Sequence, residues 1–288
     1  MENQTNVLID NLKFTEGLRW HSDRLWFCDL WDRKVYSADL NGNLKTEVII
    51  DDEPVGLGWL SDGTLLITSL MDRKLLAYKD GKLSVYCDLQ QVSPGYCHDF
   101  TVSKDDYIYL STSGFYPAYG VKPVSSSILM ITPEKKIKIA AKNIGYPNGI
   151  KIAKDGKRLF VSETFAASIA SFEIDIEHQL IHQQRLAKFD ELGFKVTFDN
   201  NGLPTDMARH YPDGLCLDES NQTIWIASPG KKEVICINAK GKIIAIINTQ
   251  SIPFDCILGG NNNKTLFIGT TDAVENSKTG KIEYFNLS

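Results

Sequence analysis

One short alternating apolar segment recurs six times along this chain, and this repetition constrains the fold more than any other feature. The copies are Leu25-Trp26-Phe27, Leu65-Leu66-Ile67, Ile108-Tyr109-Leu110, Leu159-Phe160-Val161, Ile224-Trp225-Ile226 and Leu266-Phe267-Ile268. A polar turn typical of hairpins precedes each copy, as in Ser61-Asp62-Gly63 and Lys154-Asp155-Gly156. Helical periodicity with caps is nearly absent. The pattern therefore predicts an all-β fold, a six-bladed β-propeller with four-stranded antiparallel blades around a central channel, with a β-sandwich pair or a β-helix as alternatives.

The spacing of the repeats favours a single propeller domain over residues 1–288. Successive copies suit one blade each, except that Leu159 and Ile224 are 65 residues apart, which predicts an insertion near 177–211. A propeller must close its ring. We therefore expect Val7-Leu8-Ile9 to complete the last blade beside residues 281–287.

The composition and charge of the chain limit the kinds of partner and the location that can be expected for it. The formal charge is -5 and no Lys/Arg cluster exceeds two residues, so the chain lacks the basic patch that nucleic acid requires. Its longest aliphatic run, residues 243–247, is too short to span a membrane. The N-terminus lacks the features of a secretory signal, which indicates a cytoplasmic protein whose six cysteines are buried thiols.

A second repeated position lies upstream of each apolar segment, where the innermost strand of a blade begins. It is occupied by Glu16, Val55, His98, Asn148, Asp213 and Asp255, which lie 9 to 11 residues before the respective segments. The innermost strands of a propeller line its central channel. These six side chains are therefore predicted to form a ring at one mouth of the channel.

Five of the six ring residues are potential metal ligands or acid–base groups. Carboxylate and amide oxygens are the donors that Ca²⁺ prefers, and crowded carboxylates without a cation would raise one another's pKa. Taken singly, Pro147-Asn148-Gly149 and Pro212-Asp213-Gly214 are ordinary turn tripeptides. Their coincidence in the repeat register favours a divalent-metal site with an open position for catalysis.

The residues around the ring resemble the SMP-30/gluconolactonase/LRE-like family of regucalcin-type propellers over nearly the whole chain. The motifs are Glu16-Gly17-Leu18-Arg19-Trp20-His21, Leu25-Trp26-Phe27-Cys28-Asp29, Pro147-Asn148-Gly149-Ile150, Pro212-Asp213-Gly214-Leu215-Cys216-Leu217-Asp218, and Gly259-Gly260 before Thr265-Leu266-Phe267. The resemblance implies a six-bladed propeller that binds one divalent cation, often Ca²⁺, through Glu16, Asn148 and Asp213. It also implies hydrolysis of sugar or other small lactones, with Asp213 as ligand and base.

One departure from the family pattern bears on the substrate. Sugar lactonases of the family often read Arg-x-Asn-Asp-Gly where this chain reads Tyr96-Cys97-His98-Asp99-Phe100. The Arg that would hold polyol hydroxyls is thus Tyr96, which puts a gluconolactone-like substrate in doubt. His98 replaces the Asn. As a ligand it would shift the metal preference toward Zn²⁺, Fe²⁺ or Mn²⁺; unligated, it could act as general base, and we favour the second interpretation.

The expected substrate-binding residues are Tyr96, His98, Asp99, Tyr116 and Asp255. Tyr116 belongs to an aromatic loop at 114–120 that could wall an apolar or ring-shaped substrate or could simply staple two blades together. Asp255 could be an extra acid–base group or a solvated carboxylate. Strand alternation is expected to point Asp99 away from the axis, in an orienting role.

These observations lead to a first hypothesis of a metal-dependent lactonase, a carboxylic ester hydrolase. Its cofactor would be one divalent cation, Ca²⁺ first, with Zn²⁺, Mn²⁺, Mg²⁺ or Fe²⁺ as alternatives. Its partner would be a small lactone-like molecule, with Asp213 or His98 taking the proton from water. Two alternatives remain: a Ca²⁺-binding propeller without turnover, and a related enzyme of bond-forming type. The sequence does not set the oligomeric state.

Overall fold

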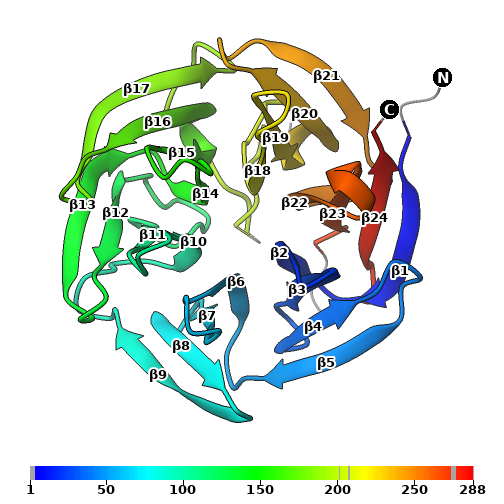
Figure 1. Cartoon of the computed structure of the whole chain (residues 1–288). Coiled ribbons are helices and arrows are strands. Elements are labelled where there is room, and N and C mark those ends of the chain that lie inside the picture. Colours follow the sequence, from blue (N-terminus) through cyan, green and yellow to red (C-terminus); the bar gives the residue numbers. More distant parts are fainter. Residues whose placement is uncertain (1–3, 201, 207, 274–276, 288) are drawn as a thin grey trace.

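Six four-stranded antiparallel sheets surround a central channel (Figure 1). The computed structural model describes residues 4–200, 202–206, 208–273 and 277–287. Within these residues, helix is limited to three short 3-10 turns, η1 (Thr164–Ala166), η2 (Pro229–Lys231) and η3 (Asn261–Asn263). The prediction of an all-β, six-bladed propeller is confirmed.

Each blade begins with its innermost strand, and the remaining strands follow outward. Blade 1 contains β2 (Thr15–His21), β3 (Arg24–Asp29), β4 (Lys34–Ala38) and β5 (Leu44–Ile49). Blade 2 contains β6 (Pro54–Trp59), β7 (Leu65–Ser69), β8 (Lys74–Lys79) and β9 (Lys82–Asp88). Blade 3 contains β10 (Cys97–Val102), β11 (Ile108–Thr112), β12 (Ser126–Ile131) and β13 (Ile137–Ile144). Blade 4 contains β14 (Pro147–Ile152), β15 (Arg158–Glu163), β16 (Ser168–Ile174) and β17 (Leu180–Lys188). Blade 5 contains β18 (Leu215–Asp218), β19 (Thr223–Ser228), β20 (Glu233–Asn238) and β21 (Ile243–Asn248). Blade 6 contains β22 (Ile252–Gly259), β23 (Thr265–Thr271), β24 (Gly280–Asn286) and β1 (Asn6–Leu12).

The six repeated apolar segments are the second strands of the blades, where both faces of the sheet are covered by neighbouring blades. Leu57 and Ile67 of blade 2, for example, pack with Val35 and Val48 of blade 1 in one buried cluster. Burying one such aliphatic side chain contributes about 1.5–3 kcal/mol. Because the same contact recurs at each blade boundary, the repeat holds the ring together as well as forming the strands.

The N-terminal strand closes the ring. β1 pairs antiparallel with β24, with Val7 opposite Glu283 and Ile9 opposite Ile282. Figure 1 shows β1 and β24 lying side by side in this blade. The buried Glu283 carboxylate accepts backbone N–H groups of Gln250 (3.0 Å) and Ser251 (3.1 Å), which ties blade 6 to the linker before it. The expected closure of the last blade by residues 7–9 is confirmed.

The extra length between blades 4 and 5 lies further along the chain than expected. Residues 180–188 of the region predicted as an insertion form β17, the ordinary outermost strand of blade 4. The surplus falls in the connection 189–214, of which residues 201 and 207 lie outside the described structure. Arg209 anchors this connection, because its guanidinium donates to the Asp190 carboxylate (2.7 Å) and to the Gly193 carbonyl (2.9 Å).

Two further expectations concern the chain as a whole. All six cysteines are buried and none forms a disulfide, as expected for thiols. Within the described ranges, no helix has the length and apolar character needed to cross a bilayer.

Candidate active site

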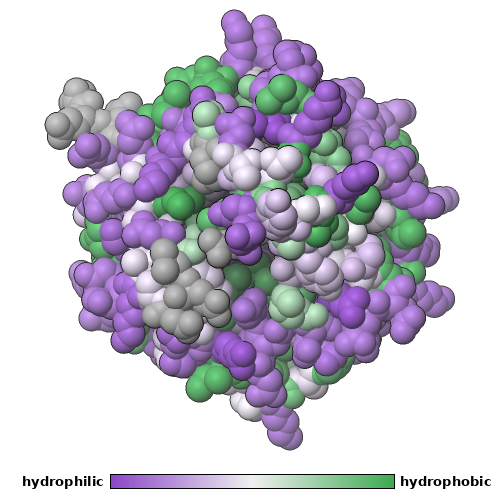
Figure 2. All heavy atoms as spheres, turned by 180° about the vertical axis from the view of Figure 1, so that it is seen from behind, coloured by the Kyte–Doolittle hydropathy of each residue, from purple (hydrophilic) through white to green (hydrophobic). Residues whose placement is uncertain are grey.

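Five of the six ring residues line one cavity of about 270 Å³ at the end of the channel where the innermost strands begin. Four of them, Glu16, Val55, His98 and Asn148, lie on β2, β6, β10 and β14, and Asp213 comes two residues before β18. Figure 2, seen from behind Figure 1, shows apolar side chains gathered in a hollow near the centre of the molecule, with hydrophilic residues around it.

An irregularity in four of the innermost strands lies at the ring residues. The pairing register shifts just after Glu16 in blade 1 and around the ring residues of blades 2, 3 and 4, whereas β22 shifts before Asp255 and β18 pairs without a shift. Such bulges redirect side chains and are common beside active sites. Gly17 follows Glu16 with a φ of 61°, and a Cβ there would lie 2.2 Å from the Val55 carbonyl oxygen. Only glycine fits at this point, which explains the Glu-Gly motif.

Glu16 and Asp213 are carboxylates in an environment that opposes their ionisation. Burial raises the pKa of Asp213 well above its ordinary value, and the negative charges of Asp255 and Asp99 raise it further. Burial also raises the pKa of Glu16, assisted first by Asp213. A hydrogen bond from Asn148 to Asp213 acts in the opposite direction. Without a cation, the two carboxylates therefore repel each other when both are ionised.

His98 is held as a neutral imidazole. Burial lowers its pKa to about 4, although the charge of Asp99 acts in the opposite direction. Its ring lies 5.7 Å from the Tyr96 ring and 5.1 Å from the Tyr146 ring, both measured between centroids. Its Nε2 atom is buried and has no hydrogen-bond partner in the described structure. This neutral ring nitrogen can accept a hydrogen bond from water, and a pKa of about 4 makes it a weak base at neutral pH.

The donor set at the cavity base is chemically suited to a hard divalent cation. Glu16, Asn148 and Asp213 offer carboxylate and amide oxygens, the ligands that Ca²⁺ prefers. Oδ1 of Asp213 is buried and makes no hydrogen bond within the described residues, an unusual state that a bound ion would relieve. Among those residues, no three His, Cys, Asp or Glu side chains are grouped to hold an ion.

The walls of the cavity are mainly apolar. Tyr96 lines it, and Tyr116 packs edge-on against Tyr96 with ring centroids 4.6 Å apart. Phe115, from the same loop as Tyr116, is buried in an aromatic cluster with Phe165 and Tyr146, both of which line the cavity. The loop 114–120 therefore packs against the residues of the wall, as expected of a staple, and neither Phe115 nor Tyr116 is among the described residues that line the cavity. No Arg or Lys is among the described residues that line the cavity.

Sequence reasoning missed most of this wall, although the repeat contained the signal. The residues two positions before the ring residues also line the cavity in five blades: Phe14, Glu53, Tyr96, Tyr146 and Tyr211. Four of these five are aromatic. Alternate residues of a strand share a face, so the register that aligned the ring residues also predicts this second layer.

The connection 189–214 supplies the outer wall. Gly202, Leu203 and Pro204 line the cavity, and Phe198 is buried in the aromatic cluster. A Cβ at Gly202 would lie 2.5 Å from the Pro117 carbonyl oxygen, so the connection rests directly on the loop 114–120. Two segments distant in sequence therefore meet over the site.

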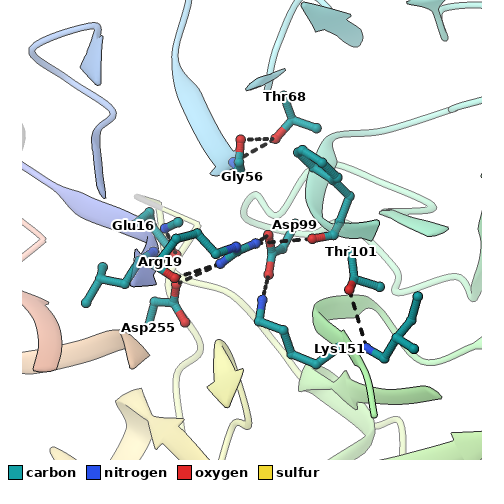
Figure 3. A network of polar contacts seen from close by, with 12 residues as sticks. Glu16, Arg19, Gly56, Thr68, Asp99, Thr101, Lys151 and Asp255 are labelled. Atoms are coloured by element: carbon teal, nitrogen blue, oxygen red, sulfur yellow. Dashed lines mark hydrogen bonds and ion pairs between the residues drawn. The ribbon is translucent and has the colours of Figure 1, made fainter. Parts of the chain in front are cut away.

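Asp99 and Asp255 are not among the described residues that line the cavity; they belong to a network of polar contacts with Arg19 and Lys151 (Figure 3). Asp99 forms ion pairs with Arg19 and with Lys151, the latter at 2.7 Å. Asp255 accepts the backbone N–H of Leu18 at 2.7 Å and lies 3.9 Å from the Arg19 guanidinium. The expectation that Asp99 points away from the axis is wrong, because the bulge in β10 between Cys97 and Phe100 interrupts the alternation on which it rested.

Comparison with known proteins places this architecture in a family. A sequence model of the SMP-30/gluconolactonase/LRE-like region matches residues 14–272. Lactonase drp35 of Staphylococcus epidermidis is 23% identical over 93% of this chain and 82% of its own length. A gluconolactonase from Xanthomonas campestris superimposes with a TM-score of 0.74 at 18% identity, over 96% of this chain and 88% of its own. A calcium-binding protein, regucalcin, from Agrobacterium tumefaciens superimposes with a TM-score of 0.76 at 17% identity, over 98% and 94%.

Proposed function

We propose that this chain, which belongs to the SMP-30/gluconolactonase/LRE-like family, is a metal-dependent hydrolase that opens a lactone or similar small cyclic ester. The observation behind the proposal is the convergence of Glu16, Asn148 and Asp213 at one apolar cavity, where a buried Asp213 oxygen lacks a partner. The lactonase and gluconolactonase names of its relatives support the same reaction class.

The ion would be held by Glu16, Asn148 and Asp213, with Ca²⁺ as the first choice. When bound, such an ion polarises an ester carbonyl and favours deprotonation of water. The Asn148 amide lowers the pKa of Asp213, as an N–H donor does, and its oxygen would be the atom that binds the ion. Two carboxylates whose pKa values are raised by burial and mutual repulsion are a costly arrangement, which a divalent cation would stabilise.

Two groups of this chain could take the proton from the attacking water. Asp213 borders the cavity and would combine this role with ion binding. His98 borders the same cavity, is neutral at physiological pH, and has an unused Nε2 atom. Variants separate them, because loss of Asp213 should impair both ion binding and turnover, whereas loss of His98 should impair turnover alone.

The cavity favours an apolar or ring-shaped lactone over a polyol. Tyr96 occupies the position where sugar lactonases of the family often have Arg, and the surrounding wall is aromatic and aliphatic. Tyr96 would contact the substrate, and Tyr116 would support Tyr96. Asp99 and Asp255 are engaged with Arg19 and Lys151, so we assign them no substrate contact.

The test is proton release from sugar, aliphatic and aromatic lactones by metal-stripped protein, with Ca²⁺, Mg²⁺, Mn²⁺, Zn²⁺ or Fe²⁺ added back singly. We expect metal-dependent opening, fastest with an apolar lactone. If every lactone stays closed with every ion while an ion still binds, the proposal fails. A calcium-binding role without turnover, which the name of the regucalcin neighbour favours, or a bond-forming reaction would then be the better account.

A further inference from the structure

The second layer of cavity residues has one member that is not aromatic. Glu53 immediately precedes β6 in blade 2, and it takes the place in this layer between Phe14 of blade 1 and Tyr96 of blade 3. Among the described lining residues, the acidic ones are Glu53 and the two carboxylates proposed as cation ligands. The proposed function therefore leaves one carboxylate of the cavity wall without a role.

Aromatic rings from the two neighbouring blades flank this carboxylate. On the side of blade 1, Phe14 packs edge-on against Trp31 with ring centroids 4.9 Å apart, and both rings line the cavity. On the side of blade 3, burial raises the pKa of Tyr96, and the negative charge of Glu53 raises it further, so the carboxylate lies within electrostatic range of that hydroxyl. All three rings pack against one apolar cluster that contains Val55. Glu53 and the rings are thus parts of one wall.

This wall offers negative charge and aromatic surface to a ligand. Glu53 and the three rings are half-buried, so they border the cavity instead of lying in the core. No Arg or Lys is among the described residues of the lining. Lys13 lies beside Trp31, but its ammonium donates to the Trp31 carbonyl (3.3 Å) and pairs with Asp32 (3.1 Å), and it does not belong to that lining.

An aromatic wall with a carboxylate is suited to a quaternary ammonium group. The faces of Trp and Tyr rings attract cations, most strongly where water is displaced, and the carboxylate adds a direct charge–charge attraction. A quaternary ammonium group has no N–H and binds through charge and methyl contacts. Hydrogen bonds that Glu53 makes within the protein therefore do not compete with it, whereas an anionic substituent would be repelled.

We propose that the substrate is a lactone or small ester that carries a quaternary ammonium group, which binds between the Glu53 carboxylate and the rings of Trp31 and Tyr96. This inference rests on the proposed function, because it takes the reacting carbonyl to lie at the proposed cation ligands. Residues two apart along an extended chain are about 7 Å apart, and this is the step from the second layer to the ring residues. The ammonium group is therefore expected several bonds away from the reacting carbonyl. Glu53 and Trp31 would determine specificity without touching the reacting atoms.

The test compares two cyclopentanones that cannot be hydrolysed and differ in one atom. One carries a trimethylammonioethyl chain, and the other carries a tert-butylethyl chain, in which carbon replaces the charged nitrogen. Calorimetry in the presence of Ca²⁺ gives both affinities without turnover. A unit charge at roughly 6 Å, with an effective dielectric constant of about 40, changes an affinity by about ten-fold. We expect wild type to bind the charged ketone more tightly, and the ratio of the two affinities to fall by about that factor in Glu53→Gln.

Two further variants separate the ring from the charge. Trp31→Leu removes an aromatic face and keeps the carboxylate, so the ratio should fall several-fold through loss of the cation–π attraction. Glu177→Gln is the matched control, because Glu177 is exposed in the turn between β16 and β17 and is not among the residues that line the cavity. Its ratio should stay within about two-fold of wild type, since solvent and salt screen a distant surface charge.

Turnover of the two corresponding lactones separates this inference from the function on which it rests. If the affinity ratio falls in Glu53→Gln but both lactones stay closed with every ion, the ammonium site stands and hydrolysis is wrong. If lactones open but wild type does not prefer the charged ketone, or the ratio is unchanged in Glu53→Gln, hydrolysis stands and the ammonium site is wrong. If Glu53→Gln does not fold, Trp31→Leu still tests the claim, since it must lower the same ratio.

Discussion

Replacing Asp213 with Asn should make the metal-free protein more stable and the metal-treated protein less stable than wild type. In the absence of an ion, Asp213 is a buried carboxylate, 6% exposed, with one unpartnered oxygen. Leaving such a group unsatisfied costs about 1–3 kcal/mol, and more when it is charged. Asn has nearly the same shape and no charge, so Asp213→Asn should recover a cost of this size.

The two effects have opposite signs because the carboxylate that destabilises the empty site would also bind the ion. An ion at 100 times its Kd stabilises the folded state by about 2.7 kcal/mol. Wild type should show this gain and Asp213→Asn should not. For a chain of this size, 1 kcal/mol corresponds to a shift of about 2–4 °C in Tm, so the melting curves of the two proteins should exchange order when Ca²⁺ is added.

The pH dependence follows from the same reasoning. Burial raises the pKa of Asp213 in the folded state, so the folded protein binds more protons than the unfolded chain above the ordinary carboxyl pKa. The metal-free wild type therefore loses stability as pH rises from about 4. The amount by which its free energy of unfolding lies below that of Asp213→Asn should shrink as the pH is lowered. The assay is thermal unfolding of chelator-treated protein with and without Ca²⁺. The reasoning is refuted if metal-free Asp213→Asn melts below wild type, or if Ca²⁺ stabilises both proteins equally.

Three further predictions test other parts of the site. If His98 is the general base, His98→Gln should lower kcat by about 10²–10⁴-fold. The Ca²⁺ affinity of this variant, measured by calorimetry, should equal that of wild type. An unchanged kcat would assign the role of base to Asp213. Leu203→Ala shortens a side chain of the outer cavity wall and leaves the proposed cation ligands unchanged. It should raise KM several-fold for a bulky apolar lactone and little for a small one. Equal effects on both lactones would contradict a role of Leu203 in selecting substrate size. Burial lowers the pKa of His210 to about 4 in the folded state, so the wild-type free energy of unfolding should fall by up to about 3 kcal/mol between about pH 6.5 and pH 4. In urea unfolding, His210→Gln should make the free energy of unfolding less dependent on pH over this range. An unchanged pH dependence would show that His210 does not titrate as stated.

The repeat in the sequence was sufficient to predict the architecture. Hydrophobic alternation in the six segments identified the second strand of each blade, and the need to close a ring identified the pairing of β1 with β24. The position of the long connection was less predictable. Residues 180–188 pair with β16 as an edge strand with mostly polar, exposed side chains, so their sequence resembles a loop more than a strand.

The repeat register of the sequence also predicts that Glu16, Val55, His98, Asn148 and Asp213 face one end of the channel, and these five residues line one cavity. It failed for the orientation of side chains next to the bulges. Asp255 occupies the same slot in the sequence, but the pairing of β22 shifts just before it, and its carboxylate turns to the N–H of Leu18. A bulge inserts one residue and reverses the faces that follow.

Contacts between distant segments were beyond the reach of the pattern. The ion pair of Arg19 with Asp99 crosses the channel between blades that are not neighbours. The close contact of Gly202 with the Pro117 carbonyl connects two long loops. Neither contact has a local signature, because each depends on where the ring brings its blades together.

The most direct test of the central claim measures bound ion and lactone opening in the same sample. Metal-stripped protein is titrated with Ca²⁺ while the rate of opening of an apolar lactone and the occupancy of the site are followed together. The account predicts that the rate rises in proportion to occupancy, saturates at one ion per chain, and stays at the metal-free baseline in Asp213→Asn at every concentration. A rate that is already maximal in the metal-free protein, or that is retained in Asp213→Asn, would contradict it.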